Sequence, residues 1–337
     1  MMSPRPRRMN QRLLRLAVGI LAVVALVPAC ASSASPAGSA PEGPQTVRMA
    51  APTSLNSLGA HVAEAAGNFA ESGLQVEFVN ATSGAQIVPM LLGQQIEFSV
   101  MDMVTAVAAA SKNLPLVIIA PAAVDSPPQN GIGNATLAVT PDSQISSVAD
   151  LAGKSMGISQ LNGLPWLQIV NLLENAGVDP ASVQFVEVEG PRAIAALQQG
   201  QVDGVWVSEP RMTEAILEGR ARSLAPTGGG EPGVPTYAYV TSRAFAERNP
   251  LLIDAFVHSV FAAHSAVNSD RGMAVDVAAS YTGVPAALLS QAYLPTFGTG
   301  PVTGTDLHGL IQNMVTHGIV EESASPDPAT LLWSSSK

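Results

Sequence analysis

Apolar positions along this chain alternate between two spacings. Residues 58–69 show the three- and four-residue spacing of a helix face, whereas Leu74, Val76 and Phe78 alternate with polar residues as in a half-buried strand. The same switch recurs as far as Leu224, after which the pattern is mainly helical. Regular alternation of strands and helices predicts an α/β fold with mainly parallel sheets.

The segment 194–210, IAALQQGQVDGVWVSEP, contains the predicted unit in its shortest form. Ile194 and Leu197 lie on one helix face, and Gly200 is suited to end that helix in a left-handed turn. Residues 202–207 form an apolar, β-branched run of strand length, and Pro210 favours a new helix. Such a strand ends at the edge of a parallel sheet where α/β proteins bind ligands.

A similar segment occurs 107 residues earlier. Residues 87–102, IVPMLLGQQIEFSVMD, place Gly93 opposite Gly200 and Asp102 opposite Glu209. The identity is modest and chance is the alternative. We interpret the repeat as two similar α/β lobes, each presenting strand ends to the other, and a cleft between lobes is a common place for a small-ligand site.

Two segments rich in Gly and Pro interrupt the pattern, at 125–133 and 227–235. They are the predicted crossings between lobes, since short irregular connections rich in these residues punctuate regular elements. The predicted first lobe therefore comprises residues 46–131 plus 237–337, and the second lobe comprises residues 132–236.

The first 29 residues have the pattern of a signal peptide. Five arginines precede the apolar run 16–27, which is short for a membrane span. Cys30, the single cysteine, follows at the position of a lipidated cysteine in a bacterial lipoprotein; ordinary secretion with cleavage near Ala29 to Ala31 is the alternative. Residues 30–45 are mostly Ala, Ser, Pro and Gly, as in a flexible linker.

Charge narrows the set of partners. The signal peptide holds five of the 16 basic residues and none of the 26 acidic ones, so the rest of the chain has a net charge of −15. Such a surface repels nucleic acid and anionic lipid, although many exported proteins are acidic for solubility alone. We expect no nucleic-acid partner.

Several short phrases resemble one family. They are Gly67-Asn68-Phe69, residues 71–77 (ESGLQVE), Leu92-Gly93-Gln94, residues 150–154 (DLAGK), residues 200–203 (GQVD) and Glu209-Pro210. Together with the leader they resemble substrate-binding lipoproteins of bacterial ABC importers, in the group that includes nitrate, taurine, alkanesulfonate and thiamine-precursor binders. The resemblance implies a two-lobed periplasmic-binding-protein fold of type II, a monomer outside the cytoplasmic membrane or in the periplasm, and permease and ATPase partners.

Candidate ligand contacts lie after predicted strands and at predicted helix starts. They are Thr53, Ser54, Ser83, Gly84, Asp102, Gln160, Asn162, Trp206, Glu209 and Tyr237. Helix starts offer free N–H groups to anions, the two acidic residues offer acceptors to amino groups, and the aromatic rings can stack on a planar ligand. Helix capping and core packing are the structural alternatives. Arg192 and Arg211, beside the cleft, can bind a sulfonate or simply be solvated, and Trp166 is a further aromatic candidate.

The same residues bear on which class of ligand is bound and on whether the protein is an enzyme. Few Lys and Arg residues at the loop ends slightly favour a thiamine-type pyrimidine over a sulfonate or nitrate, an ordering that tight taurine binding would overturn. The fold also resembles a sulfinate desulfinase and a pyrimidine synthase, but Cys30 lies in the leader and the five histidines lie on predicted helices. We therefore expect that the protein is not an enzyme and that it binds no cofactor or metal. A lipid-anchored sensor domain is the third alternative.

Overall fold

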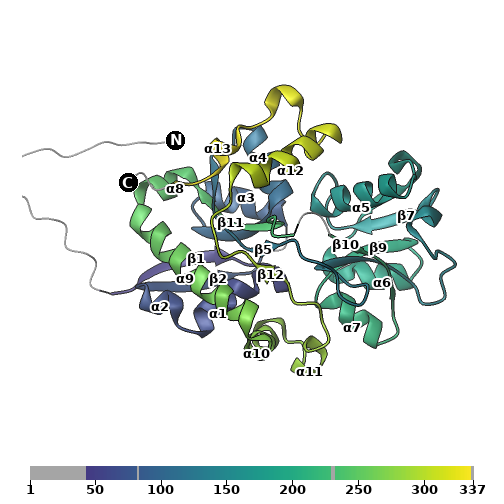
Figure 1. The fold of residues 1–337 in the computed structure, drawn as a ribbon, viewed down its shortest axis with the longest axis horizontal. Helices are drawn as coiled ribbons and strands as arrows, with labels where there is room; N and C mark the ends of the chain where they lie inside the picture. The colour runs from purple at the N-terminus through teal and green to yellow at the C-terminus, as the bar shows by residue number, and fades with distance from the viewer. Residues whose placement is uncertain (1–42, 82, 229–231, 335–337) are drawn as a thin grey trace, which may run out of the picture. The chain divides into compact units, whose positions relative to one another are not determined.

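The computed structural model describes residues 43–81, 83–228 and 232–334, whose elements are drawn in Figure 1. The predicted signal peptide, Cys30 and most of the predicted linker lie outside the described residues.

The first sheet has the strand order β2-β1-β3-β11-β4. Its strands are β1 (Gln45–Ala50), β2 (Leu74–Val79), β3 (Phe98–Asp102), β4 (Leu116–Pro121) and β11 (Tyr237–Ser242). Strand β1 pairs in parallel with β2 and β3, whereas β11 runs antiparallel to β3 and β4. Strand β11, the last of these strands in the sequence, is therefore the antiparallel strand of this sheet.

The second sheet repeats this arrangement with the order β10-β6-β9-β7-β8. Its strands are β6 (Ala135–Val139), β7 (Ser155–Ile158), β8 (Gln184–Glu187), β9 (Gly204–Ser208) and β10 (Arg222–Thr227). Strand β7 is parallel to β8 and β9, and β6, which arrives from the first sheet, is antiparallel to β9 and β10. The predicted two-lobed α/β fold is confirmed, with one antiparallel strand in each described sheet.

Two connections join the sheets, from β4 to β6 and from β10 to β11. They pair with each other, because Asp125 N donates to Val234 O at 2.7 Å and Gly233 N donates to Asp125 O at 2.8 Å. Beside them, β5 (Ala123–Val124) pairs with β12 (Thr296–Phe297).

Helices cover both faces of each sheet (Figure 1). On the first sheet one apolar core includes side chains of α1, α2, α9 and α10, and another includes those of α3, α4 and α12. These helices are α1 (Leu58–Ala65), α2 (Asn68–Glu71), α3 (Gly84–Leu92), α4 (Met103–Ser111), α9 (Pro250–Ser269), α10 (Arg271–Thr282) and α12 (Gly304–Thr316), with α8 (Arg243–Arg248), α11 (Ala286–Leu289) and α13 (Pro328–Leu331) completing the C-terminal part. We call the first sheet and these helices the first lobe.

The second lobe is the second sheet with α5 (Leu164–Asn175) on one face and α6 (Ala193–Gln198) and α7 (Arg211–Leu217) on the other. Short 3-10 turns occur at Leu55–Ser57, Val148–Leu151, Pro180–Ser182, Gly190–Arg192 and Glu322–Ala324. Helix α9 has the length and hydropathy of a membrane span, but it contributes Phe256 and Val260 to the core of the first lobe.

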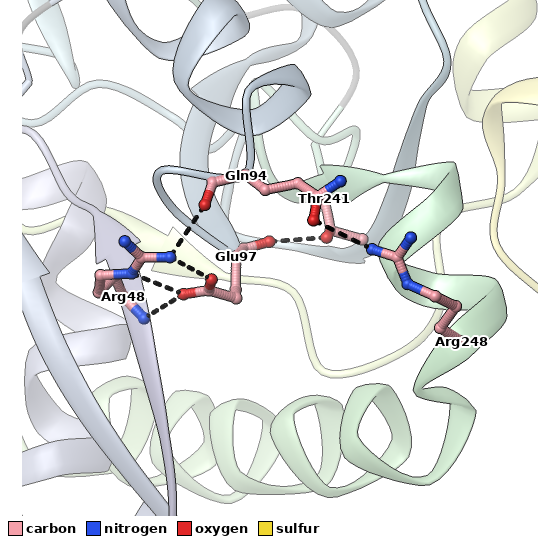
Figure 2. Close-up of polar contacts among 5 residues, drawn as sticks. All are labelled: Arg48, Gln94, Glu97, Thr241 and Arg248. Carbon is pink, nitrogen blue, oxygen red and sulfur yellow. Dashed lines mark hydrogen bonds and ion pairs between the residues drawn. The ribbon is translucent and has the colours of Figure 1, made fainter. Parts of the chain in front are cut away.

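A carboxylate fixes the start of the middle strand in each sheet. Figure 2 shows Glu97, just before β3, accepting from Arg48 N at 2.7 Å and from Arg48 Nη2 at 2.6 Å. Thr241 Oγ1 of β11 donates to Glu97 O at 2.6 Å, so the residue joins three strands. In the second sheet, Asp203 accepts from Ser155 N at 2.8 Å. These bonds set the parallel register that brings the opposite strand ends together.

Candidate functional site

A cleft of about 330 Å³ lies where the carboxyl ends of strands from both sheets meet. Its walls include residues that lie at or just after the ends of β1, β2 and β3 in the first lobe and of β7, β8 and β9 in the second. This is the edge at which open α/β sheets bind ligands. A larger cavity of about 780 Å³ lies between α4, α5, α12 and the second connection, away from most of these strand ends. We therefore regard the smaller cleft as the candidate site.

The start of α3 forms one wall of the cleft. Ser83 is its N-cap residue, and its side chain makes no capping hydrogen bond. Gln86 N and Ile87 N bond to Ser83 O, at 3.0 and 3.1 Å. As at any helix start, the first N–H groups have no acceptor within the helix, so they are suited to bind an anionic group. Ser83 and Gly84, two of the predicted ligand contacts, thus both line the cleft.

Gly84 permits a close approach between two helices. A Cβ atom at this position would lie 2.3 Å from Thr105 Cγ2 on α4, which is too close for any side chain without movement. Thr105 is itself fixed by Asp102, whose two carboxylate oxygens accept from Thr105 N at 2.8 Å and Thr105 Oγ1 at 2.7 Å. Asp102 therefore sets the position of the α3 start, through Thr105.

Asp102 also lines the cleft, although its oxygens are already used. Burial raises the pKa of its carboxyl, while the bonds from Thr105 act in the opposite direction. This is the helix-capping alternative stated above, combined with a place in the cleft wall. We treat Asp102 chiefly as a positioning residue.

Glu209 does not line the cleft. It is only 1% exposed and accepts from Thr213 Oγ1 at 2.7 Å, Thr213 N at 3.1 Å and Tyr293 N at 3.3 Å. Burial raises the pKa of the Glu209 carboxyl, and these bonds oppose the rise. With its oxygens occupied in this way, the side chain is placed to fix α7 and the segment after α11.

The second-lobe wall of the cleft contains Gln160, Trp206 and Arg211. Trp206 Nε1 donates to Gln168 Oε1 at 2.9 Å, which fixes the orientation of the indole ring. Within the described part of the chain, the Arg211 guanidinium makes no hydrogen bond or ion pair. A half-buried cation at the cleft is therefore available to an anionic ligand.

Three further candidates from the second lobe lie elsewhere. Asn162 is in an exposed turn with φ of 54° and is not among the residues that line the cleft. Arg192 is 79% exposed and faces Glu189 at 3.6 Å. Trp166 contacts Phe185 and His317 edge-on, in the packing role stated as its alternative.

The first-lobe wall is completed by Thr53, Ser54 and Tyr237. Tyr281 OH donates to Ser54 O at 2.8 Å and so fixes the loop after β1. Tyr237 begins β11 opposite Asp102, and burial raises the pKa of its hydroxyl far above the ordinary value. The cleft thus combines residues separated by more than 180 positions in the sequence.

Sequence reasoning missed several residues of the site. Asn80, Ser159 and Ser208 also line the cleft just after or at the end of β2, β7 and β9, and the strand-end rule applied to every strand would have found them. Asn56, Asn134 and Thr227 line a small chamber next to the cleft. Nothing in their sequence pattern marks them, because they meet only through the fold.

Metal ligands and histidines are the next groups to consider at the cleft. Among the described residues, no group of three or more His, Cys, Asp or Glu side chains is placed to hold a metal ion. His264 is buried between Tyr239 and Gly298, and His61 is stacked between Phe78 and Tyr281. The groups that face the cleft are suited to hold a small polar ligand.

Comparisons with known proteins identify relatives of this chain. The taurine-binding periplasmic protein of Escherichia coli K12 is 29% identical over 202 residues, and a putative aliphatic sulfonates-binding protein of the same strain is 27% identical over 153. These alignments cover 59% and 45% of this chain and 60% and 47% of those relatives, so the matched part spans less than two thirds of their length.

Solved structures show the same fold over most of both chains. The periplasmic aliphatic sulphonate-binding protein of Escherichia coli matches with a TM-score of 0.69 at 21% identity, covering 86% of this chain and 98% of that one. The nitrate-binding protein of Synechocystis PCC 6803 matches with 0.68 at 15%, covering 85% of each. The model of the family described as NMT1/THI5 like matches residues 54–269, more than half of the sequence, which confirms the resemblance found in the phrases above. The chain therefore belongs to the NMT1/THI5-like family.

Proposed function

We propose that this protein is the substrate-binding component of an ABC importer and that it captures a small organic sulfonate. The observation that carries the proposal is the pairing, across one cleft, of the α3 start with the Arg211 guanidinium. Helix N–H groups and a guanidinium are the donors that hold a compact oxyanion. The names of the relatives, which bind taurine and aliphatic sulfonates, favour this class over the pyrimidine that the sequence slightly favoured.

The mechanism is capture followed by closure. In this proposal residues 46–131 plus 237–337 and residues 132–236 are the two lobes. A ligand that contacts both lobes binds the closed arrangement more tightly than the open one and shifts the population toward it. The closed protein then docks on a permease, whose partner ATPase supplies the energy. We place the protein outside the cytoplasmic membrane as a monomer, held by a lipid on Cys30.

Two alternatives are less well supported. An enzyme of this fold needs a nucleophile or an acid–base pair at the ligand, but Cys30 is the only cysteine and His264 and His61 lie in packed environments away from the cleft. The relatives named above are binding proteins. A lipid-anchored sensor would use the same cleft without a permease, and neighbouring permease and ATPase genes would argue against it.

Calorimetric titration tests the proposal directly. We expect ethanesulfonate or taurine to bind, and nitrate and an aminopyrimidine to bind more weakly. Replacing Arg211 by Ala should weaken sulfonate binding by about 10- to 100-fold, because a hydrogen bond to a charged group is lost. Arg192→Ala is the matched control, since this exposed arginine also begins a helix but faces Glu189. Binding of the aminopyrimidine alone, or ligand turnover, would overturn the proposal.

A further inference from the structure

A small chamber lies between the lobes, next to the cleft. It holds about 10 Å³, which is the space of one water molecule. Its wall includes Asn56 of the first lobe, Asn134 directly before β6, and Thr227 at the end of β10. Trp206 and Tyr237 line both the chamber and the cleft, so the chamber directly adjoins the candidate ligand site.

Backbone contacts bring these three residues together. Thr227 pairs with the first residue of β6, and this residue directly follows Asn134. Glu209 N donates to Asn134 O at 3.2 Å. From the first lobe, Leu55 N donates to Glu209 O at 3.4 Å, and Asn56 is the next residue along the chain. The three residues therefore meet through the second sheet and through a main-chain contact between the lobes.

Three buried side-chain oxygens in the chamber wall have no hydrogen-bond partner within the described part of the chain. They are Asn56 Oδ1, Asn134 Oδ1 and Thr227 Oγ1. Asn56 and Thr227 are each only 2% exposed. Buried polar groups are nearly always hydrogen-bonded, because leaving one unpaired is costly. The chamber is therefore suited to an occupant that bonds to all three oxygens.

The kinds of group in the wall match the bonding capacity of water. The two amide oxygens only accept hydrogen bonds, whereas the threonine hydroxyl can donate one. A water molecule has two O–H donors and can also accept, so it can donate to both amide oxygens and accept from the hydroxyl. Three hydrogen bonds are typical of a buried water molecule, and a larger polar group exceeds the volume of the chamber.

We infer that the chamber binds one water molecule, held by Asn56, Asn134 and Thr227, and that this water bridges the two lobes beside the cleft. The water site itself does not depend on the identity of the ligand. Its effect on ligand binding rests on the proposed function, in which every ligand is captured by the same closure of the lobes. A bridge between the lobes then changes the affinities for all ligands by the same factor.

A high-resolution crystal structure tests the site directly, with and without ethanesulfonate. We expect one peak of water density within about 2.7–3.2 Å of all three oxygens in both crystals. Direct hydrogen bonds among the three side chains, or an atom of the ligand inside the chamber, would show that the water site is wrong. This measurement requires no variant.

A variant tests the role of the water between the lobes. Thr227→Val keeps the side-chain shape and removes the hydroxyl, and should weaken ethanesulfonate and taurine binding by the same factor of about three to ten. Thr241→Val is the matched control, because its hydroxyl is also buried but bonds to Glu97 O within the first lobe. Both variants should lower Tm by roughly 2 °C, but only Thr227→Val should change the affinities.

The outcomes separate the water site from the proposed function. If Thr227→Val leaves both affinities unchanged, or weakens only one ligand, the water does not bridge the lobes as inferred. If neither sulfonate binds to the wild-type protein, the proposed function fails, and the crystallographic density alone decides the water site.

Discussion

Asp102 and Glu209 occupy matching positions in the two lobes and have diverged in use. Asp102 ends the middle strand of its sheet and Glu209 directly follows the middle strand of the other, and each accepts both the N–H and the O–H of a threonine in the next helix. Asp102 stays within its own lobe and forms part of the cleft wall. Glu209 lies away from the cleft and also accepts from Tyr293 N, in a segment that follows the first-lobe helix α11.

The difference shows that the same structural unit forms part of the cleft wall in one lobe and makes a contact between the lobes in the other. Leu55 N of the first lobe donates to Glu209 O at 3.4 Å, so main chain and side chain of this residue both meet the first lobe. The matching residue Asp102 instead supports Thr105, against which Gly84 packs. The acidic residue is common to both units, but its surroundings decide its role.

The largest expected effect is on the free energy of unfolding, which should distinguish the role of Glu209 from that of Asp102. Glu209→Ala should lower the free energy of unfolding by about 3 kcal/mol, because it removes the buried acceptor of Thr213 N, Thr213 Oγ1 and Tyr293 N. Asp102→Ala should cost about 1 kcal/mol, as expected for a cap alone. Urea unfolding measures both. Glu189→Ala, whose side chain is 76% exposed, should change little. Equal losses at Asp102 and Glu209 would contradict the distinction.

Much of this comparison was predictable from the sequence. The offset of 107 residues placed Asp102 opposite Glu209, and apolar spacing placed the helix before Gly200 and the strand after it close to the observed α6 and β9. These elements depend on local spacing and on Gly200, which adopts positive φ at the helix end. Helix capping was also stated in advance as the alternative for both acids, and it describes the bonds of Asp102. Glu209 instead precedes Pro210, the N-cap residue of α7, and accepts from Thr213.

Other features depend on contacts between distant residues. The predicted helix over 58–69 is divided, because Gly67 adopts φ of 79° and α2 begins at Asn68. No spacing rule indicates that Tyr293 reaches Glu209, or that Asn56 meets Asn134 and Thr227, since each pair is joined only when the C-terminal segment and the two connections are in place. Residue type identified the candidates, and tertiary structure determined which of them share a cavity.

The two lobes should also differ in their response to acid. Residues 135–227 contain no histidine, whereas burial lowers the pKa of His61 and His264 in the first lobe to about 4. The fold therefore holds both rings neutral, and the unfolded chain binds more protons between pH 6.5 and 4. Stability should fall through this window as the pH drops, by at most about 1.4 kcal/mol per pH unit for each ring.

A variant at His264 separates the contribution of this ring to the pH dependence of stability. The raised pKa values of Asp102 and Glu209 act in the opposite sense near their titration, so the difference between proteins is more informative than either curve. His264→Gln should have a shallower slope of unfolding free energy against pH than wild type. Tyr239→Phe, which removes the hydrogen bond to His264 but keeps the ring, should lower stability by about 1 kcal/mol without changing the slope. Parallel slopes for His264→Gln and wild type would refute the assignment.

The smallest expected effect concerns the starts of β3 and β9, the first of which is shown in Figure 2. Glu97 and Asp203 each accept from a backbone N–H of the neighbouring strand, so replacing either by Ala should cost about 1 kcal/mol. Glu97 also forms an ion pair with Arg48, whose side chain is 42% exposed. Arg48→Met should therefore lower Tm by roughly 1 °C in dilute buffer and by less in 1 M salt, because screening weakens an exposed ion pair. A salt-independent loss as large as that of Glu97→Ala would show that the guanidinium, rather than the shared backbone bond, fixes the first sheet.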